Sequence, residues 1–382
     1  MRIILFSSSL SYGGAERQLV SLARGMKDMG DEVVVVTLHD QRDLIAELLE
    51  KEIEYFTLKQ VSSLLFPLSV LRFWLKERSF KADLVYSMLN GPNLIAALAK
   101  ILRPSTKLIW GIRSSGVRFR DFPWHEYVTF RVCAALSRIP DLIIANSYAG
   151  KKFYVDSGYQ TDSFKIISNG IDLEKFHFSE PGRGQVRSRW GVKANEILIG
   201  MVARIDPLKD HRSFIEAASL ICENNDNIKF VIVGDGPEDR VRELQEYARE
   251  RLVHNTLIWA GKRNDLCDVF SAFDLHVLAS HEGEGFPNVI GEAMACGVPC
   301  IGFDVGDIVR IINDEEFIVR KHNGPALAKK IFEKLTCVGD LTLAVSLRNR
   351  IASEFSIKKM IEHTRAECLT VIKKHSLSFV ET

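Results

Sequence analysis

The chain has 382 residues, more than one ordinary hydrophobic core accommodates, so we expect two domains. Its 46% hydrophobic and 26% charged residues are typical of a soluble globular protein, and a net charge of +1 does not support nucleic-acid binding through a general basic field. The seven scattered cysteines argue against a disulfide framework and favour reduced thiols in the cytosol.

The first residues, MRIILFSSSLSYGGAE, contain an apolar run that ends at Phe6, which is too short for a signal sequence. No window reaches about 18 uncharged apolar residues, so we predict no membrane span and expect a cytoplasmic protein. Cys296 and Cys300 are the closest pair of cysteines, but nothing else with ligand spacing surrounds them. We therefore predict no metal site and interpret both as small core residues.

The first half alternates short β-branched runs with amphipathic stretches, such as the helical patterns at 15–29 and 91–102. This alternation predicts a parallel sheet with helices on both faces. The expected strands are 2–7, 33–38, 54–58, 84–87, 107–111, 142–146 and 165–168.

The pattern breaks after Gly170, and we interpret 172–190, which has mixed charge, Pro181 and two glycines, as an interdomain linker. It then restarts, with the clearest helices expected at 207–223 and 237–251. The later strands are expected at 197–203, 229–234, 257–260, 274–279 and 299–303.

These patterns predict an α/β protein made of two Rossmann-like, doubly wound domains at 1–175 and 176–355. An amphipathic C-terminal helix within 356–382 is expected to cross back to the first domain. Sheets of this kind bind ligands at the carboxyl ends of their strands, so a cleft between the domains is the expected site.

Gly13 and Gly14 lie between the first strand and a helix, where free backbone amides attract phosphate. Two glycines in a strand-to-helix turn also occur for structural reasons, so both interpretations stay open. No G-x-G-x-x-G motif follows any expected strand, which argues against a nicotinamide dehydrogenase.

The second half opens with V-A-R-I-D-P-L-K-D, which puts Arg204 at the carboxyl end of a strand and Lys209 five residues later. Two cations facing a cleft suit a diphosphate, because Arg can bind two phosphate oxygens and Lys adds a point charge. A solvated surface pair is the alternative.

Two further strand ends add weaker signals. Gly234 and Gly236 allow the backbone to lie against a flat group, and Lys262 or Arg263 can stack on or cap a nucleobase. Glycines after strands are also common turn residues, so each signal is modest alone.

Residues 282–299, EGEGFPNVIGEAMACGVP, place two carboxylates, Glu284 and Glu292, eight positions apart beside a helix that starts near Pro287. The amides of the turn 285–288 can bind hydroxyl or phosphate oxygens, and the acids can accept hydrogen bonds from the hydroxyls of a sugar and a ribose. The alternative is that each acid is held by an arginine elsewhere in the fold.

Together the motifs resemble the large family of retaining GT-B glycosyltransferases, family 4-like, which includes bacterial mannosyl-, glucosyl- and N-acetylhexosaminyl-transferases of cell-surface glycan assembly. The motifs run in the family's order over nearly the whole chain. The resemblance implies a GT-B architecture and transfer of a sugar, with retention, from a nucleotide-diphosphate sugar to an acceptor hydroxyl, without a metal or other cofactor. The motifs are the E-x7-E block, V-A-R-I-D-P-L-K-D, V-G-D-G-P-E, S-N-G-I-D-L-E-K-F and G-G-A-E.

The resemblance also implies residue roles. Arg204, Lys209 and Glu284 form the catalytic group, the two cations holding the diphosphate, and Glu292 holds the ribose. The remaining donor-binding candidates are Gly13, Gly14, Gly234, Lys262, Arg263, Gly285, Phe286, Pro287, Asn288 and Val289.

The acceptor is expected on the first domain, where the candidates are Arg113, Ser114, Arg118 and Asn146. Many family members carry a His near the position of Ser114, and nothing in the sequence places His125 in the cleft instead. Segment 101–150 has seven Lys and Arg against three Asp and Glu, with aromatic residues between them, which fits an anionic membrane or a polyprenyl-diphosphate acceptor. The stretch 64–80 allows a similar interpretation, or that of a helix packed on a sheet.

The expected acceptor is therefore a lipid-linked or growing glycan of lipopolysaccharide, capsule or exopolysaccharide synthesis, met at the inner face of the cytoplasmic membrane. Domain closure over the donor is expected, with hinges near 170–190 and Phe355. A nucleotide-sugar epimerase or hydrolase on the same scaffold, and a non-catalytic nucleotide-sugar-binding protein, are the alternatives.

Overall fold

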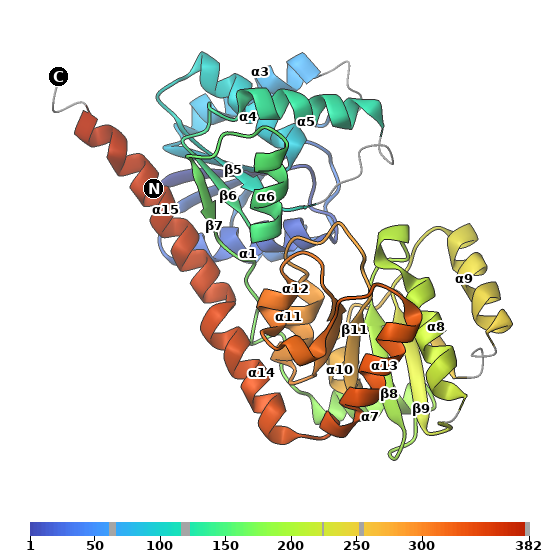
Figure 1. Ribbon diagram of the computed structural model, residues 1–382. Helices are drawn as coiled ribbons and strands as arrows, with labels where there is room; N and C mark the ends of the chain where they lie inside the picture. Colours follow the sequence, from blue (N-terminus) through green and yellow to red (C-terminus); the bar gives the residue numbers. More distant parts are fainter. Residues whose placement is uncertain (61–65, 116–122, 224, 252–255, 379–382) are drawn as a thin grey trace. The chain divides into compact units, whose positions relative to one another are not determined.

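The computed structural model of the protein describes residues 1–60, 66–115, 123–223, 225–251 and 256–378 (Figure 1). The chain forms two compact units: Met1–Gly170 together with Ile357–Thr382, and Ile171–Ser356. We call these the N-terminal unit and the C-terminal unit. Each contains one parallel sheet between layers of helices, which confirms the predicted α/β fold class.

Within the described residues, the N-terminal sheet has seven strands in the order β3-β2-β1-β4-β5-β6-β7. All are parallel, and Ile3 of β1 pairs with Val33 of β2 and Leu84 of β4. The strands are β1 (Arg2–Ser7), β2 (Glu32–Thr37), β3 (Glu54–Thr57), β4 (Leu84–Met88), β5 (Lys107–Ile112), β6 (Leu142–Ala145) and β7 (Phe164–Ile166).

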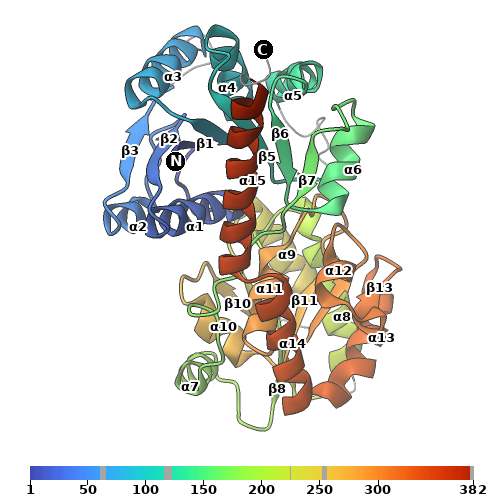
Figure 2. The same cartoon turned by 90° about the vertical axis from the view of Figure 1, so that its left-hand side faces the viewer.

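Helices cover both faces of this sheet because successive strand residues point to opposite sides. Ile3 and Leu5 belong to the core that includes α1 and α15, whereas Ile4 and Phe6 belong to the core that includes α3, α4 and α5. Figure 2 shows α15 running along its face of the sheet. The helices are α1 (Gly14–Asp28), α2 (Ile45–Leu49), α3 (Phe66–Phe80), α4 (Asn90–Leu102), α5 (Trp124–Leu136), α6 (Tyr148–Asp156) and α15 (Ile357–Ser378).

The C-terminal sheet has six parallel strands within the described residues, in the order β10-β9-β8-β11-β12-β13. The central pair consists of β8 and β11, in which Gly200 of β8 lies opposite His276 of β11. The strands are β8 (Ile197–Val202), β9 (Ile228–Val233), β10 (Leu257–Gly261), β11 (Leu275–Leu278), β12 (Cys300–Phe303) and β13 (Ile318–Val319). The two-residue β13 escaped sequence prediction because it is too short to show a pattern.

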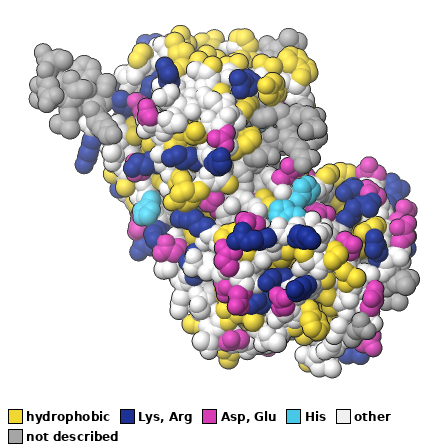
Figure 3. Space-filling model, in the orientation of Figure 1, with side chains coloured by type: hydrophobic (Ala, Val, Ile, Leu, Met, Phe, Trp, Pro, Cys, Tyr) yellow, Lys and Arg dark blue, Asp and Glu magenta, His cyan; other side chains and the backbone are white. Residues whose placement is uncertain are grey.

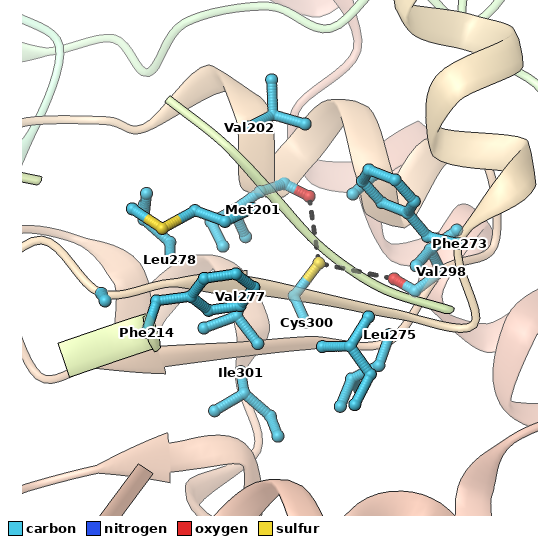
Figure 4. Close-up of a cluster of buried hydrophobic side chains, with 14 of the residues drawn as sticks. Met201, Val202, Phe214, Phe273, Leu275, Val277, Leu278, Val298, Cys300 and Ile301 are labelled. Atoms are coloured by element: carbon cyan, nitrogen blue, oxygen red, sulfur yellow. Dashed lines mark hydrogen bonds between the residues drawn. The ribbon is translucent and has the colours of Figure 1, made fainter. Parts of the chain in front are cut away.

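One continuous core fills the C-terminal unit. Figure 4 shows Phe214 against Val277 of β11, with Cys300 nearby. Both Cys296 and Cys300 are buried, as the sequence interpretation expected. The helices are α7 (Glu180–Arg189), η3 (Pro207–Lys209), α8 (His211–Cys222), α9 (Glu238–Glu250), α10 (Leu266–Ala272), α11 (Asn288–Ala295), α12 (Ile308–Ile312), η4 (Glu315–Phe317), α13 (Gly324–Lys334), η5 (Leu335–Cys337) and α14 (Leu341–Glu354).

Two sequence expectations need correction. Residues 172–190 are not an irregular linker, because α7 occupies 180–189 and is held in the C-terminal unit by Arg183 and Arg187, which both pair with Asp274. The helix expected at 207–223 is interrupted at Asp210, which has a positive φ of 46° and caps α8. In the described parts of the chain, no helix is long and apolar enough to cross a membrane.

Candidate functional site

The strand order of the C-terminal sheet reverses between β8 and β11, which are hydrogen-bonded neighbours. In open parallel sheets, ligands bind outside the carboxyl ends of the strands at this switch point. The loop after β8 carries Arg204 and Lys209, and the loop after β11 carries Glu284. Three residues singled out in separate stretches of sequence therefore come from the two loops at this crevice.

The two loops are joined directly. The backbone N–H of His281 donates to the carbonyl oxygen of Leu208 (3.2 Å), and Lys209 Nζ donates to Glu284 Oε1 (2.5 Å). Lys209 ends a short 3-10 turn that Asp206 caps by accepting from the N–H of Leu208. The ion pair is mostly buried, so solvent screens it weakly.

Glu284 is 7% exposed and needs polar partners, because an unpaired carboxylate in the interior is strongly disfavoured. Ser280 Oγ donates to the same oxygen, Oε1, at 2.7 Å. The cation bound to Glu284 is thus Lys209, a residue of the predicted site, rather than an arginine elsewhere in the fold. We call Lys209, Ser280 and Glu284 the Lys–Glu site.

Helix α11 starts beside the Lys–Glu site. Pro287 is its N-cap and no side chain in the described residues caps it, so its first turn favours a ligand that is anionic or rich in oxygen. Glu292 is buried and lies four residues after Asn288, on the same helix face. The side chain of Phe286 is also buried and packs edge-on against Phe355, at 5.3 Å between ring centroids. It is a core residue, so only its backbone is available to a ligand.

The loop after β12 braces the turn that carries Glu284. The N–H of Asp307 donates to the carbonyl oxygen of Gly285 (3.0 Å). Gly306 has a φ of 62°, and a Cβ there would lie 2.3 Å from the carbonyl oxygen of Glu284. This position therefore requires glycine, both for its backbone conformation and for space.

Arg204 is accessible, with 78% of its side chain exposed. The loop after β9 supports its backbone, because a Cβ on Gly234 (φ 151°) would lie 1.9 Å from the carbonyl oxygen of Ala203. A Cβ on Gly236 would lie 2.4 Å from the carbonyl oxygen of Ile205. Close packing of two backbones therefore requires glycine at both positions, and the expected approach of a flat ligand to them stays a prediction.

The two residues proposed to contact a nucleobase differ in their surroundings. Lys262 is exposed at the end of β10. Arg263 instead directs its guanidinium to Asp265, through Nε (2.8 Å) and Nη2. Asp265 thus engages two of the guanidinium nitrogens of Arg263, whereas the side chain of Lys262 is exposed; contact of either residue with a nucleobase stays a prediction.

At the carboxyl edge of the N-terminal sheet, α1 begins at Gly14, and Gly13 is its N-cap. The carboxylate of Glu16 folds back over this start, because a Cβ on Gly13 would lie 2.0 Å from Glu16 Oε2. Burial raises the pKa of Glu16. A phosphate here would meet this acid, so the geometry does not support the phosphate site expected from the two glycines.

Two acceptor-side candidates follow β5 and are held by their own unit. Arg113 donates through Nη1 to Asn169 Oδ1 and through Nη2 to the Tyr86 hydroxyl, both at 2.9 Å. Ser114 Oγ lies 3.3 Å from the hydroxyl of Tyr154. These contacts fix a cation and a hydroxyl at the edge where acceptor binding was expected.

The remaining candidates are more dispersed. Asn146 follows β6, is buried, and has an Oδ1 without a hydrogen-bond partner in the described parts of the chain. Arg118 lies outside the described residues. His125 is exposed on α5 beside the ring of Trp124, which places it on the surface.

Leu89, directly after β4, has φ 76° and ψ 158°, a strained combination usually confined to glycine.

Sequence analysis missed Ser280, Glu16 and the Gly306–Asp307 brace. Ser280 stands four residues before Glu284, but serine is common in loops and gives no signal alone. Glu16 was visible in G-G-A-E, although nothing in the pattern indicated that its carboxylate covers Gly13. The brace joins segments about twenty residues apart, which periodicity does not reveal.

The chain thus has two Rossmann-like units, and an acid–cation pair lies at the strand switch point where sheets of this kind bind ligands. Two family models match the chain: "Glycosyltransferase Family 4" over residues 12–175 and "Glycosyl transferases group 1" over residues 183–349. The chain belongs to this family of bacterial GT-B glycosyltransferases.

Relatives and solved structures agree with this assignment. The chain is 31% identical over 223 residues (56% of this chain, 54% of the relative) to an Escherichia coli UDP-Gal:alpha-D-GlcNAc-diphosphoundecaprenol alpha-1,3-galactosyltransferase. It is 25% identical over 322 residues (82% and 84%) to a Campylobacter jejuni N-acetylgalactosamine-N,N'-diacetylbacillosaminyl-diphospho-undecaprenol 4-alpha-N-acetylgalactosaminyltransferase. Anabaena Alr3699/HepE in complex with UDP shares the fold, with a TM-score of 0.85 at 23% identity over 97% of this chain and all of that one. The chain spans 37–54% of the length of three curated relatives at 30–31% identity.

Proposed function

We propose that the protein transfers a sugar from a nucleotide-diphosphate sugar to a hydroxyl of a lipid-linked or growing glycan. One observation carries the proposal: the Lys209–Glu284 pair, buried at the switch point of the C-terminal sheet beside the start of α11. Diphosphate and sugar hydroxyls together complement a site that offers both a cation and carboxylates. The relatives named above, with a UDP-sugar donor or diphosphoundecaprenol-linked acceptors, support the same substrate classes.

Each residue of the site has a role in this proposal. Lys209 and Arg204 bind the diphosphate, and Glu284 accepts hydrogen bonds from the transferred sugar. Glu292, one turn into α11, accepts them from the ribose. The amides at the start of α11 stabilise the negative charge that develops as the diphosphate leaves.

We further propose that the reaction retains the anomeric configuration. The bond between the anomeric carbon and the diphosphate oxygen breaks while the acceptor oxygen bonds to the same face of that carbon. The proton of the acceptor hydroxyl passes to the departing phosphate. Lys209 and Arg204 neutralise that leaving group, so the scheme assigns no role to a metal ion.

The acceptor is assigned to the carboxyl edge of the N-terminal sheet. Arg113 and Ser114 supply a cation and a hydroxyl there, and Asn146 supplies an amide oxygen that has no hydrogen-bond partner among the described residues. A glycan linked to a polyprenyl diphosphate presents matching groups, namely phosphate oxygens for Arg113 and sugar hydroxyls for the other two.

Exposed apolar side chains on three helices of the N-terminal unit support contact with a membrane. Leu68, Leu71 and Leu75 follow helical spacing on the outer side of α3, while Phe73 of the same helix is buried. Figure 3 shows hydrophobic side chains, with Lys and Arg among them, gathered along the top of this unit. We define the α3–α5 surface as Leu68, Leu71, Leu75, Ile101, Leu102, Trp124, Tyr127, Val128 and Val132.

Membrane contact is tested by flotation with vesicles that contain or lack an anionic lipid. Leu71→Glu combined with Leu75→Glu should reduce the bound fraction, because two carboxylates oppose burial in the interface. The control is Phe332→Glu, an exposed apolar residue of α13 outside the surface. Equal flotation of all proteins, or none with any lipid, contradicts this part of the proposal.

Sugar transfer itself is tested with UDP-, GDP-, ADP- and CMP-sugars. A donor that binds the native state raises the melting temperature. The same donor should then yield a glycosylated polyprenyl-diphosphate-linked acceptor whose new bond has the donor's anomeric configuration. Free sugar or an isomeric nucleotide sugar as the main product with acceptor present would identify a hydrolase or an epimerase instead.

A further inference from the structure

The C-terminal unit contains a cavity of about 510 Å³ at the edge of its sheet opposite the Lys–Glu site. Phe273 and Asp274, just before β11, and Val298 and Pro299, just before β12, form part of its wall. Its lining therefore lies at the amino ends of strands whose carboxyl ends face the site described above. The end of α11 and one side of α14 complete the wall.

The lining is largely hydrocarbon. Figure 4 shows Phe273 beside Val298 in a cluster of buried hydrophobic side chains, and both residues line the cavity. Ala344 of α14 belongs to the wall and packs on Gly297. A Cβ added to Gly297 would lie 3.2 Å from the Cβ of Ala344. Apolar walls of this kind bind apolar molecules.

The cations in the wall are bound within the chain. Arg183 Nη2 pairs with Asp274 (2.6 Å), and its Nη1 donates to the carbonyl oxygens of residues 271–273. Arg348 donates to the carbonyl oxygens of Leu173, Phe176 and Ala295. These contacts occupy the guanidinium groups and leave no cation to neutralise an anionic ligand.

The acid at the mouth is also engaged, since Asp340 caps α14 by accepting from the N–H groups of Thr342 and Leu343. With Asp274 paired to Arg183, the wall has balanced charge and its charged groups are satisfied. A charged ligand would gain no partner here and would lose hydration, so the wall suits an uncharged one.

Large apolar side chains stand exposed around the mouth. Phe178, Leu341 and Val345 are 52%, 79% and 61% exposed and all line the cavity. In the described part of this unit, the other exposed large apolar residues are Leu220 and Phe332. Three of five such residues thus meet at one opening, a concentration that marks a binding site rather than scattered surface residues.

We propose that this cavity binds a neutral hydrocarbon chain of up to about twenty carbon atoms, linear or isoprenoid. A volume of about 150 Å³ is enough for a benzene ring, so this one, about three times larger, suits a short chain. A largely apolar wall whose charged groups are paired within the chain favours a hydrocarbon chain over a polar or charged ligand. The inference does not depend on the proposed sugar transfer, because none of its residues belongs to the Lys–Glu site.

The test is calorimetric titration of the full protein with 1-decanol. Saturable binding of one molecule, with a negative heat-capacity change, is expected because apolar surface is buried. Val345→Glu should weaken binding at least tenfold, since it places a carboxylate at the mouth on an exposed helix position. Leu220→Glu, the same type of change on α8 outside the cavity, should leave the affinity within twofold of the wild type.

A second variant, Ala344→Phe, fills the cavity and should abolish binding, with an unchanged cooperative melting transition as the check on folding. Absence of saturable binding to the wild type would overturn the proposal. Equal weakening by Val345→Glu and Leu220→Glu would do so as well. A wild type that dimerises in sedimentation and ignores decanol, with a monomeric Val345→Glu, would assign the mouth to a second copy of the chain instead.

Discussion

The two sheets share one strand order around their central pair, yet their carboxyl edges are built differently. In the C-terminal unit, an acid and a cation from separate loops bind each other, braced by Ser280. In the N-terminal unit, Arg113 and Ser114 are bound by neighbours of their own unit, and Glu16 covers the start of α1. In the proposed function, the C-terminal edge binds the diphosphate of the donor, and the separate polar groups of the N-terminal edge bind the acceptor.

The largest expected effect is at the C-terminal edge. Lys209→Ala should lower kcat by about 10²–10³, roughly 3–4 kcal/mol, because it removes preorganised positive charge from the leaving diphosphate. Glu292→Ala should mainly raise the donor KM, since the ribose contact is equal in ground and transition states. Steady-state kinetics separates these outcomes. Lys229→Ala is the control, because Lys229 lies on β9 and pairs with Glu196. Equal loss of kcat in the Lys209 and Glu292 variants contradicts the assignment.

Lowering the pH should destabilise the C-terminal unit through two buried histidines, His211 and His276. Burial lowers the pKa of His211 to about 4 and that of His276 to about 3, from the ordinary 6.5. The unfolded chain gains protons below pH 6.5 while the fold does not, so stability that is present above pH 6.5 is lost as the pH falls toward 4. The loss is about 2–3 kcal/mol for each histidine by pH 4.5.

Urea unfolding at pH 7, 5.5 and 4.5 measures this dependence. His276→Leu should flatten it, because the buried ring with its shifted pKa is gone, even if the variant is less stable at pH 7. An identical pH dependence of stability in the wild type and the variant would show that His276 does not cause the loss of stability in acid.

At the N-terminal edge, Arg113→Ala should raise the KM for a polyprenyl-diphosphate-linked acceptor about tenfold, the size expected for one hydrogen bond to a charged group. The donor KM should stay unchanged, because the donor is assigned to the other edge. Lys152→Ala is the matched control, since Lys152 is exposed on α6 and pairs with Asp156 of the same helix. A change in the donor KM without a change in the acceptor KM would assign Arg113 to the donor and contradict the proposed division between the two edges.

The smallest effect concerns the hydroxyl that braces Glu284. Ser280→Ala should lower kcat/KM about fivefold, or roughly 1 kcal/mol, because Glu284 loses one hydrogen bond but keeps Lys209. The control is Ser271→Ala. Ser271 lies on α10, is as buried as Ser280, and its hydroxyl donates to the backbone carbonyl oxygen of Cys267. Matching losses in the two serine variants would point to general destabilisation rather than to positioning of Glu284.

Strands and helices were largely readable from sequence, because buried parallel strands such as 2–7 and 197–203 have strong local patterns. The helix at 180–189 was missed since its Pro and glycines are typical of loops, while the ion pairs with Asp274 that stabilise it are distant in sequence. Glu284, Lys209 and Arg204 could be selected because charges at strand ends are rare and their positions follow topology.

Their mutual contacts could not be predicted in the same way. Pairing of Lys209 with Glu284 depends on how two loops fold over each other, as do the engagement of Arg263 by Asp265 and the position of the Glu16 carboxylate. Gly234 was selected as a ligand contact, but the carbonyl oxygen of Ala203 occupies the space where its Cβ would be. Sequence identifies such a glycine without revealing which neighbour requires it.

The most direct test of the account is calorimetric binding of the best nucleotide sugar to the wild type and to Lys209→Met, which removes the charge and keeps the length of the side chain. We predict that affinity falls at least tenfold in the variant and that the wild type releases the nucleotide sugar more readily as salt rises. Equal affinity for both proteins, with an unchanged dependence on salt, would show that the diphosphate binds elsewhere.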